Sequence, residues 1–447
     1  MKKDIDFINN DTGKSLMAMF IPLLFAMILT MIYSMVDSLW VGNMLGENGL
    51  SALTAGTAIV LVMSSLSMGM GNGVSVMVAQ LIGAGKKNEL PAACASIMAS
   101  SAVVSVLGCV LTEFLVEPIL LLMGTPELII NDAALYLKLY LIGNVALFLY
   151  MQFTSIFRAF GDSVFQMKGM IITAAFNAVA DPFLIKIWGL AGAAIVTVAS
   201  EVLCLVYAYI YYRKKKYFDL DFKNINMQYV KTMFKLGIPT SIQSVMPALS
   251  SAVMVSFVTA FGTQAIAGFG VARNLEYFMF MPTTAMCMAV TTIVGQCNGA
   301  KRTDRADDYL RKALLIGGSM IAIISVAVIF FSGNLAAMFG QNLEVSKITE
   351  GYFKVLSIGF VLYMITSCLQ GYITGMARPG TAMVLLILYY IVFRIPLAVF
   401  LKKPLGIYGI WAAFLISHIL AALVGIYLYK KVSSEIKEDI IHEGSVL

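Results

Sequence analysis

The feature that most constrains this chain is a series of long apolar runs that recurs from Leu16 almost to the C-terminus. A helix rises 1.5 Å per residue, so about 20 apolar residues cross the ~30 Å hydrocarbon layer of a bilayer. The composition agrees, because 60% of the residues are hydrophobic and only 13% are charged. We therefore expect an all-α integral membrane protein, and a soluble globular protein is excluded.

Glycine, proline and charged residues divide this apolar sequence into twelve predicted spans. Basic residues concentrate in the connections after the even-numbered spans, such as 213–216 and 430–431. Positive charge marks cytoplasmic loops, so both termini are predicted to be cytoplasmic. The spans cover residues 15–39, 50–82, 92–113, 132–157, 164–186, 189–212, 236–261, 265–297, 307–331, 350–374, 380–400 and 406–429.

An internal repeat relates the two halves of the chain. The motif QxxGA at 80–84 recurs at 296–300, an offset of 216, and GxxG at 189–192 recurs at 406–409, an offset of 217. Each half holds an even number of spans, so both enter the membrane from the same side. This predicts a parallel repeat whose pseudo-twofold axis lies along the membrane normal.

The repeat predicts two six-helix lobes that face a central cavity and suit alternating access. Each lobe holds one copy of the repeat. The expected parts are a cytoplasmic N-terminus (1–14), an N-terminal lobe (15–212), a cytoplasmic linker (213–235), a C-terminal lobe (236–429) and a cytoplasmic tail (430–447).

Two carboxylates lie inside the predicted spans at a similar depth. Asp37 is about 20 residues into its span and Asp181 about 17, so each lies about 25 to 30 Å from its cytoplasmic start. Asn177 precedes Asp181 by one helical turn, and Pro182 frees a backbone carbonyl. Such hard oxygen ligands suit a proton or Na⁺, which predicts a coupling-ion site. The alternative is that both carboxylates lie at the headgroups and are merely solvated.

The acidic pair is confined to the first half. At the offset of 217, Asp37 corresponds to Met254 and Asp181 to Ala398. The repeated architecture therefore does not itself require these carboxylates.

The second half carries its own polar residues. Arg273 and Glu276 are three residues apart and able to pair on one helix face, and Arg394 lies in the eleventh span. Glu276 either serves a cationic substrate or a proton, or it belongs to a structural ion pair. Glu201 and His418 occupy equivalent mid-span positions in the repeat, and their roles stay open.

Methionine is abundant, and Met27 and Met31 lie in the same span as Asp37. Flexible thioethers suit a promiscuous apolar pocket, although methionine at helical spacing also serves plain packing.

Other function classes find no support in the sequence. Lys and Arg form no basic face with interleaved aromatics, so no nucleic acid partner is expected despite the net charge of +6. The six cysteines show neither CxxC nor His/Cys spacing, and no Walker A, GxSxG or HExxH sequence occurs. We expect no enzyme and no cofactor beyond a coupling ion.

Several stretches together resemble the MATE (multidrug and toxic compound extrusion) family, nearer its DinF-like branch than its NorM branch. The resemblance covers about residues 15–430 and rests on the order and spacing of the motifs. They are "VDSLWVGNMLGENGLSALTAG", "VAQLIGAGKKNEL", "FRAFGDSVFQMKGM", "NAVADPFLI", "GLAGAAIVTVAS", "FGTQAIAGFGVARNLEYFMFMP" and "VGQCNGAKRTDRA".

The resemblance implies an antiporter that exports organic, mostly cationic compounds in exchange for H⁺ or Na⁺. It implies a coupling site formed by Asp37, Asn177, Asp181 and Thr197. The seventh span carries Gln243 but lacks the acidic residue of NorM-like members, and Glu276 is a candidate to replace it.

We expect the incoming ion to neutralise Asp37 and Asp181, and the first span to bend near Pro22 or to shift. The expected setting is a monomer in the inner membrane of a bacterium, in contact with lipid.

Two alternatives belong to other classes. A flippase for lipid-linked saccharides would have more helices and an arginine-rich cavity. An intramembrane aspartyl protease would also use paired carboxylates, but it has no reason for a parallel repeat.

Overall fold

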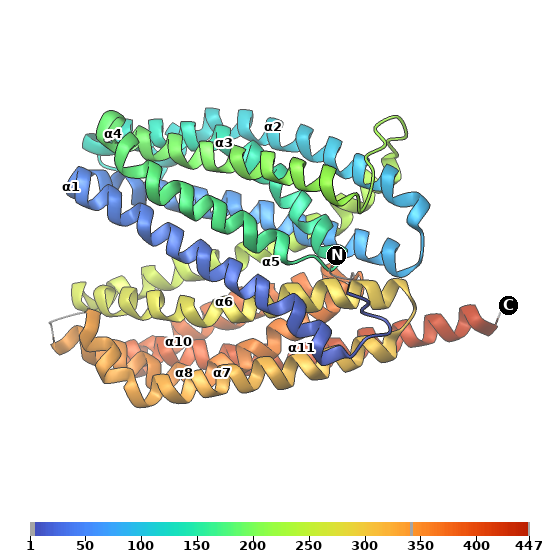
Figure 1. Cartoon of the computed structure of the whole chain (residues 1–447). Helices are drawn as coiled ribbons and strands as arrows, with labels where there is room; N and C mark the ends of the chain where they lie inside the picture. The colour runs from blue at the N-terminus through green and yellow to red at the C-terminus, as the bar shows by residue number, and fades with distance from the viewer. Residues whose placement is uncertain (1–4, 340–342, 446–447) are drawn as a thin grey trace. The chain divides into compact units, whose positions relative to one another are not determined.

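The computed structural model describes residues 5–339 and 343–445, and the side chains of all of these except 48, 57–58, 335–339 and 441–445. Every regular element in this part of the chain is a helix, as predicted (Figure 1). The elements are α1 (Thr12–Gly83), η1 (Lys87–Glu89), α2 (Leu90–Leu122), α3 (Glu127–Ala159), α4 (Val164–Lys215), α5 (Met227–Val258), η2 (Thr259–Phe261), α6 (Thr263–Gly299), α7 (Thr303–Phe339), α8 (Leu343–Gly375), α9 (Pro379–Ile387), the π-helix η3 (Leu388–Phe393), α10 (Arg394–Leu405) and α11 (Ile407–Ser445).

Eleven helical stretches among the described residues are long and apolar enough to cross a membrane. Two of them, Thr12–Glu47 and Gly49–Gly83, make up α1, which is interrupted at Gly46 (φ 69°, ψ −159°). The prediction counted twelve because it divides α4 into two spans. This helix has 52 residues and is interrupted at Gly189 (φ 58°, ψ −138°). The protein is therefore a multi-pass membrane protein.

The chain divides into two compact units. One is built mainly from Ile21–Ser241, and the other combines Asp6–Phe20 with the chain from Ile242 onward. The first residues of α1 thus belong with the second half of the sequence. Hydropathy alone does not reveal this grouping, because it depends on long-range contacts.

Two predicted boundaries differ from the structure. The connection between α4 and α5 covers residues 216–226 rather than 213–235, and α11 continues to Ser445 where a tail from 430 was expected. Both differences have one cause. The prediction ends each span where polar residues begin, whereas polar residues such as Lys and Glu are good helix formers and let the helix continue past the apolar stretch.

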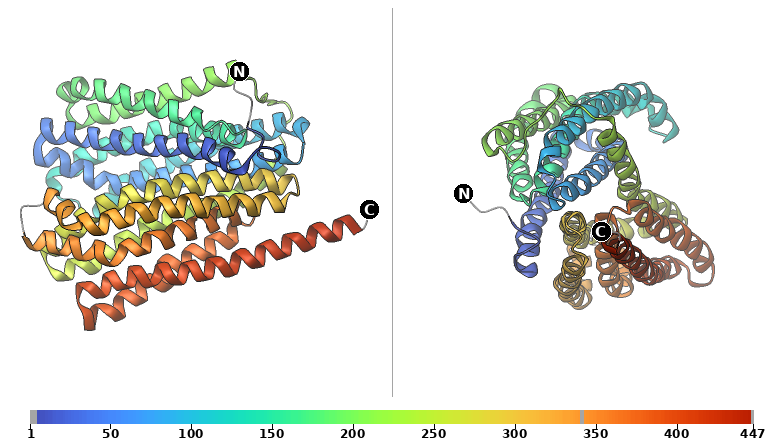
Figure 2. Two further views of the ribbon diagram at one scale, coloured as in Figure 1. Left: turned by 60° about the horizontal axis from the view of Figure 1, so that its bottom comes forward. Right: turned by 90° about the vertical axis from the view of Figure 1, so that its right-hand side faces the viewer.

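Within each unit, long helices pack side by side. In the first unit α3 packs between α2 and α4, and in the second α8 packs against α6, α7 and α11 (Figures 1 and 2). Small residues permit the closest approaches, as is usual for membrane helices. A Cβ at Gly371 in α8 would come within 2.8 Å of the Cys287 carbonyl oxygen in α6.

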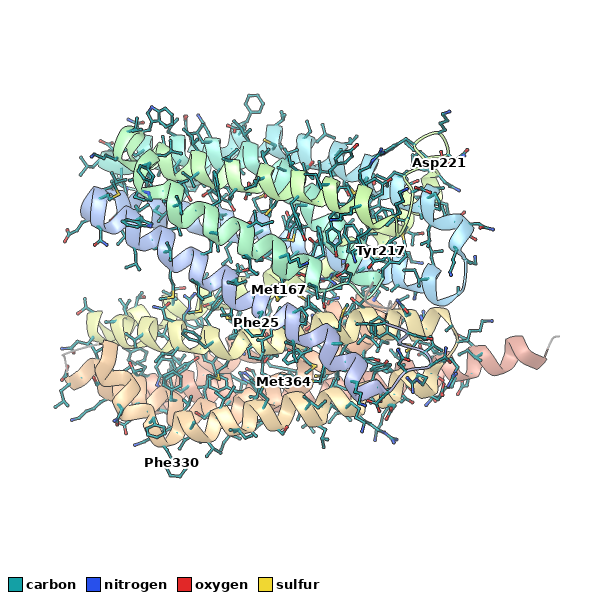
Figure 3. The ribbon with its side chains drawn as sticks, in the orientation of Figure 1. Phe25, Met167, Tyr217, Asp221, Phe330 and Met364 are labelled. Carbon is teal, nitrogen blue, oxygen red and sulfur yellow. The ribbon has the colours of Figure 1, made fainter. Side chains whose placement is uncertain are left out.

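Large apolar side chains cover the outside of both units. Leu122 on α2 is 87% exposed, and Phe330 on α7 is 79% exposed and points away from its neighbours (Figure 3). Such surfaces agree with contact to lipid chains.

The turns after residues 188 and 405 have the same geometry in both units. Gly189 has φ 58° and ψ −138°, and Gly406 has φ 60° and ψ −138°, a conformation that side chains with a Cβ rarely adopt. Three residues later, Gly192 and Gly409 each lie against a backbone carbonyl, that of Leu184 or Leu401. The GxxG motif therefore folds back the two segments that it joins.

We predict that Gly192→Ala lowers the free energy of unfolding by about 1 to 3 kcal/mol, because the added methyl group overlaps the Leu184 carbonyl. The check is the thermal unfolding midpoint in detergent. Gly108→Ala is the matched control, since nothing lies within 4 Å of a Cβ there. Equal midpoints for both variants would contradict the proposed role of the GxxG turn.

Candidate functional site

The centre of the candidate site is Asp181, on the first half of α4. It is 0% exposed, and neither carboxylate oxygen has a hydrogen-bond partner. Asn177, one turn earlier, is also buried and donates from Nδ2 to the Thr173 carbonyl at 2.9 Å. Its Oδ1 is left without a partner. Three unpaired oxygens therefore lie on one helix face.

Asp37 approaches this group from α1. Its side chain is half-buried, and its Oδ1 is shielded from solvent without a hydrogen-bond partner. It lies close enough to Asp181 for their charges to interact. Two carboxylates that sequence separates by 144 positions thus share one environment in the first unit.

Thr197 on the second half of α4 also belongs to this environment. It is buried, and its Oγ1 donates to the Ala193 carbonyl at 3.1 Å. The same Oγ1 lies 3.4 Å from the Tyr33 hydroxyl on α1, four residues before Asp37. The two halves of α4 and the segment 33–37 of α1 therefore all contribute to the cluster.

Two tyrosines of α3 complete the cluster, and the sequence reasoning missed them. Tyr136 interacts electrostatically with Asp37, Asp181 and Glu201, and Tyr140 does so with Asp37 and Glu201. Two signals were available in the sequence. The tyrosines are four residues apart and so share a helix face, and Tyr136 recurs in the repeat as Tyr352. We call Tyr33, Asp37, Tyr136, Tyr140, Asn177, Asp181 and Thr197 the acidic cluster.

The second unit holds a different polar group around Glu276. This buried residue of α6 accepts a hydrogen bond from the Tyr352 hydroxyl at 2.7 Å. Arg273 and Arg394 lie within electrostatic range of its carboxylate, but Arg273 is exposed. Glu276 therefore has a hydrogen-bond donor and a nearby positive charge, unlike Asp181.

Arg394 is held by aromatic rings. Its guanidinium carbon lies 4.6 Å from the ring centre of Tyr389, 4.8 Å from that of Tyr390 and 4.4 Å from that of Phe414. Its Nε donates to Ser417 Oγ at 3.1 Å. The residue follows the π-helix η3, a distortion that often occurs at functional sites.

The remaining candidates from the sequence are not ionisable. Gln243 is buried, donates to the Pro379 carbonyl at 2.8 Å and accepts from Gln370 at 3.0 Å, so it joins α5 to α8 and α9. Met27 and Met31 are half-buried on α1. Pro22 lies inside α1, next to the point where the chain passes from one unit to the other.

The repeat places contrasting residues at equivalent positions. At an offset of 217, Asn177 corresponds to Arg394 and Glu201 to His418. His418 is buried, and its Nδ1 lies 2.6 Å from the Phe414 carbonyl, to which it donates. A neutral amide and a carboxylate in the first unit thus correspond to a guanidinium and an imidazole in the second.

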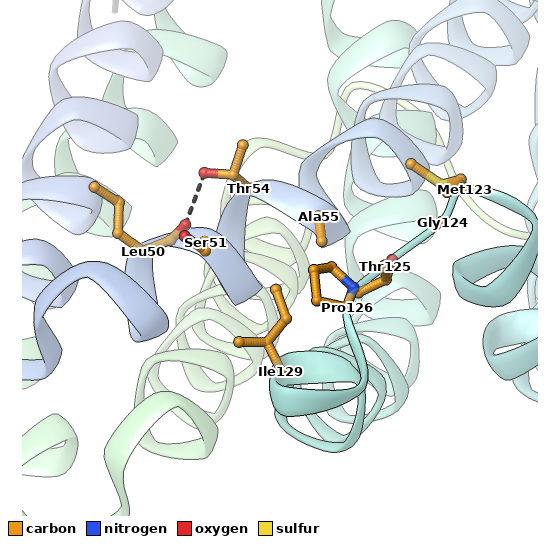
Figure 4. A pocket seen from close by; sticks show the side chains of 9 residues that line it. All are labelled: Leu50, Ser51, Thr54, Ala55, Met123, Gly124, Thr125, Pro126 and Ile129. Carbon is orange, nitrogen blue, oxygen red and sulfur yellow. Dashed lines mark hydrogen bonds between the residues drawn. The ribbon is translucent and has the colours of Figure 1, made fainter.

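One cavity of about 490 Å³ lies elsewhere in the first unit (Figure 4). It is lined by the start of the second span of α1 and by the connection from α2 to α3, including Thr54, Thr125 and Pro126. None of its lining residues is ionisable, so it is distinct from the acidic cluster.

A metal site made of three or more His, Cys, Asp or Glu side chains does not occur among residues 5–339 and 343–445. The acidic cluster offers instead two carboxylates, an amide oxygen and hydroxyls. These are hard oxygen donors of the kind that bind a proton or an alkali cation rather than zinc.

Comparison with known proteins relates the whole chain to transporters. It is 27% identical to the probable multidrug resistance protein YoeA of Bacillus subtilis, over 94% of both chains. It is 23% identical to an FAD transporter of Shewanella oneidensis, over 98% of both. It is also 23% identical to the multidrug export protein MepA of Staphylococcus aureus, over 94% of both.

Solved structures share the fold. A MATE family multidrug resistance transporter in an outward-facing conformation superposes with a TM-score of 0.92 at 20% identity, covering 98% of this chain and 99% of the other. The Vibrio cholerae MATE transporter VcmN in its bent form has a TM-score of 0.90 at 22% identity, covering 95% of this chain and 98% of the other.

The family model described as MatE matches the chain twice, at residues 22–183 and 239–400. These stretches are equal in length and offset by 217 residues, the offset of the internal repeat. The members of this family are transporters rather than enzymes. The chain therefore belongs to the MATE family of multi-pass membrane transporters.

Proposed function

We propose that this protein is a secondary active antiporter that exports organic, mostly cationic compounds in exchange for H⁺ or Na⁺ by alternating access. The observation that carries the proposal is the burial of Asp181 with both carboxylate oxygens unpaired, within electrostatic range of Asp37. A charged carboxylate at the centre of a membrane helix costs at least ~2.5 to 3.5 kcal/mol. Binding of an ion removes this cost, so the cluster responds strongly to ion occupancy.

The donor set is compatible with either ion. A proton converts one carboxylate to a neutral acid, whereas Na⁺ would be held by Asp37, Asp181 and the Oδ1 of Asn177, with Thr197 close by. The unpaired Oδ1 of Asn177 supports this assignment, because its Nδ2 is already engaged by the Thr173 carbonyl.

Helix α1 connects the acidic cluster to both units. Its first residues group with the second unit, tied by the Tyr309 hydroxyl, which donates to the Phe7 carbonyl at 2.9 Å. From Ile21 onward it groups with the first unit, and Pro22 lies at this boundary. Proline removes a backbone hydrogen bond and weakens a helix locally. We infer that ion binding at Asp37 changes the bend of α1 near Pro22.

We further propose twelve membrane crossings, with α4 crossing twice on either side of Gly189. Membership in the DinF-like branch is supported by the acidic cluster in the first half and by Gln243, which is neutral, in the seventh predicted span. The proposed setting is a bacterial inner membrane, with a monomer whose termini are both cytoplasmic. The relatives named above give the flippase alternative no support.

Asp37→Asn and Asp181→Asn are each predicted to lower ion-driven efflux of a cationic dye from liposomes at least tenfold, because the amide cannot exchange a proton or balance a cation. Ethidium in reconstituted vesicles provides the measurement. Glu117→Gln is the control, since Glu117 is exposed and pairs with Lys138 at the surface. Full efflux by both aspartate variants would overturn the proposal.

Imposing one ion gradient at a time identifies whether H⁺ or Na⁺ is the coupling ion. We expect a pH gradient alone, or a Na⁺ gradient alone, to drive ethidium efflux, and the Asp181→Asn variant to lose the response to the active ion. Efflux that requires ATP and ignores both gradients would refute secondary transport.

We propose a structural role for Glu276, because Tyr352 donates to it and Arg394 lies near it. Glu276→Gln keeps an oxygen that can accept the Tyr352 hydrogen bond. We therefore predict efflux within about twofold of the parent protein, accompanied by a lower thermal midpoint in detergent. A tenfold loss of efflux without loss of stability would instead assign Glu276 to coupling or to the substrate.

A further inference from the structure

Glu201 is a buried carboxylate that the acidic cluster does not include. It lies on the second half of α4, is 7% exposed, and its Oε2 has no hydrogen-bond partner. It follows the Gly189 turn by 12 residues, about 18 Å at 1.5 Å per residue, whereas Asp181 precedes the turn by 8 residues, about 12 Å. Glu201 is therefore about one helical turn further from the Gly189 turn than Asp181.

The Glu201 side chain occupies a notch in α3. A Cβ at Gly143 would overlap Glu201 Oε2 and would also come within 3.0 Å of the Val198 Cα. The absence of a side chain at Gly143 thus lets the backbones of α3 and α4 approach closely at the carboxylate.

Among the residues that the structure describes, no lysine, arginine or histidine pairs with Glu201. The titratable groups that face it are Tyr136 and Tyr140 from α3 and Cys204 from its own helix. All three are neutral at ordinary pH, and Tyr136 also interacts with Asp37 and Asp181. A charged Glu201 would therefore be an isolated buried anion, which is among the most costly arrangements in a membrane.

We propose that Glu201 is a third proton-binding carboxylate of the first unit, joined to the acidic cluster through Tyr136. In the conformation described here its carboxylate has taken up one H⁺ and is a neutral carboxylic acid packed against Gly143. The acid releases that H⁺ to water when the α3–α4 contact opens. This inference rests on the proposed antiport, and it adds a proton to the ion exchange at Asp37 and Asp181.

The repeat provides an internal comparison. His418 occupies the equivalent position in the second unit, where its ring lies against Gly359, with Cγ 3.6 Å from the position of a Cβ there. Its Nδ1 donates to the Phe414 carbonyl at 2.6 Å, so a ring nitrogen that would be costly to bury is paired. The equivalent notch thus holds a hydrogen-bonded imidazole in the second unit and, in the first, a carboxylate whose Oε2 has no hydrogen-bond partner.

Infrared difference spectroscopy of the purified protein in lipid nanodiscs tests the proposal directly. A buried carboxylic acid has a C=O stretching band that disappears when it loses its proton. We expect a pH titration of the parent protein to contain a band that Glu201→Gln removes and that the Asp37→Asn, Asp181→Asn double variant retains. Glu201→Asp should keep a carboxylic acid band at a shifted frequency, and His418→Gln should leave the spectrum unchanged in this region.

Identical titrations for the parent protein and Glu201→Gln, with both eluting as monodisperse protein, would overturn the proposal. The spectrum needs no transport, so it is independent of the efflux assay. If the parent protein shows no ion-driven dye efflux but its spectrum contains the Glu201 band, the antiport is refuted and the protonation site stands. If the parent protein shows ion-driven dye efflux but no Glu201 band, the protonation site is refuted and the antiport stands.

Discussion

The burial of carboxylates without partners in a hydrocarbon environment is the constraint on which this structure depends. A soluble protein would solvate Asp37, Asp181 and Glu201 or pair them with arginine. Here Asp181 and Glu201 are almost fully removed from water, and the charged group that interacts with Asp181 is the Asp37 carboxylate. The remaining way to lower their free energy is to bind an ion. Occupancy of the cluster and packing of the helices around it are therefore energetically linked.

The internal repeat allows the buried carboxylates of the first unit to be compared with the equivalent positions of the second. The GxxG turns at 189–192 and 406–409 have nearly identical backbone geometry, and Tyr136 and Tyr352 each serve a buried carboxylate of their own unit. The ionisable side chains, in contrast, differ between the two units. The positions of Asn177 and Glu201 in the first unit hold Arg394 and His418 in the second. In the second unit the buried Glu276, Arg394 and His418 each have a hydrogen-bond partner, namely the Tyr352 hydroxyl, the Ser417 hydroxyl and the Phe414 carbonyl.

Much of the fold was predictable because hydrophobic length and positive charge follow directly from the physics of the bilayer. The repeat offset needed only counting, and counting along the predicted spans also pointed to Asp37 and Asp181 as partners, which do interact in the structure. The grouping of Asp6–Phe20 with the second unit was not predictable, since it depends on contacts such as that of Tyr309 with Phe7. Tyr140 was missed because a tyrosine in an apolar span looks like any aromatic packing residue. The environment of Glu201 was not predictable either, because it depends on the space left by Gly143, and a glycine in an apolar span does not by itself indicate a contact with a carboxylate.

We propose that the acidic cluster itself binds the coupling ion. Charge displacement on a solid-supported membrane tests this most directly, because a rapid jump in H⁺ or Na⁺ concentration moves charge into the protein before any substrate is present. We expect a transient current in the parent protein and its loss in the Asp37→Asn, Asp181→Asn double variant. An undiminished current in the double variant would show that the coupling ion binds elsewhere.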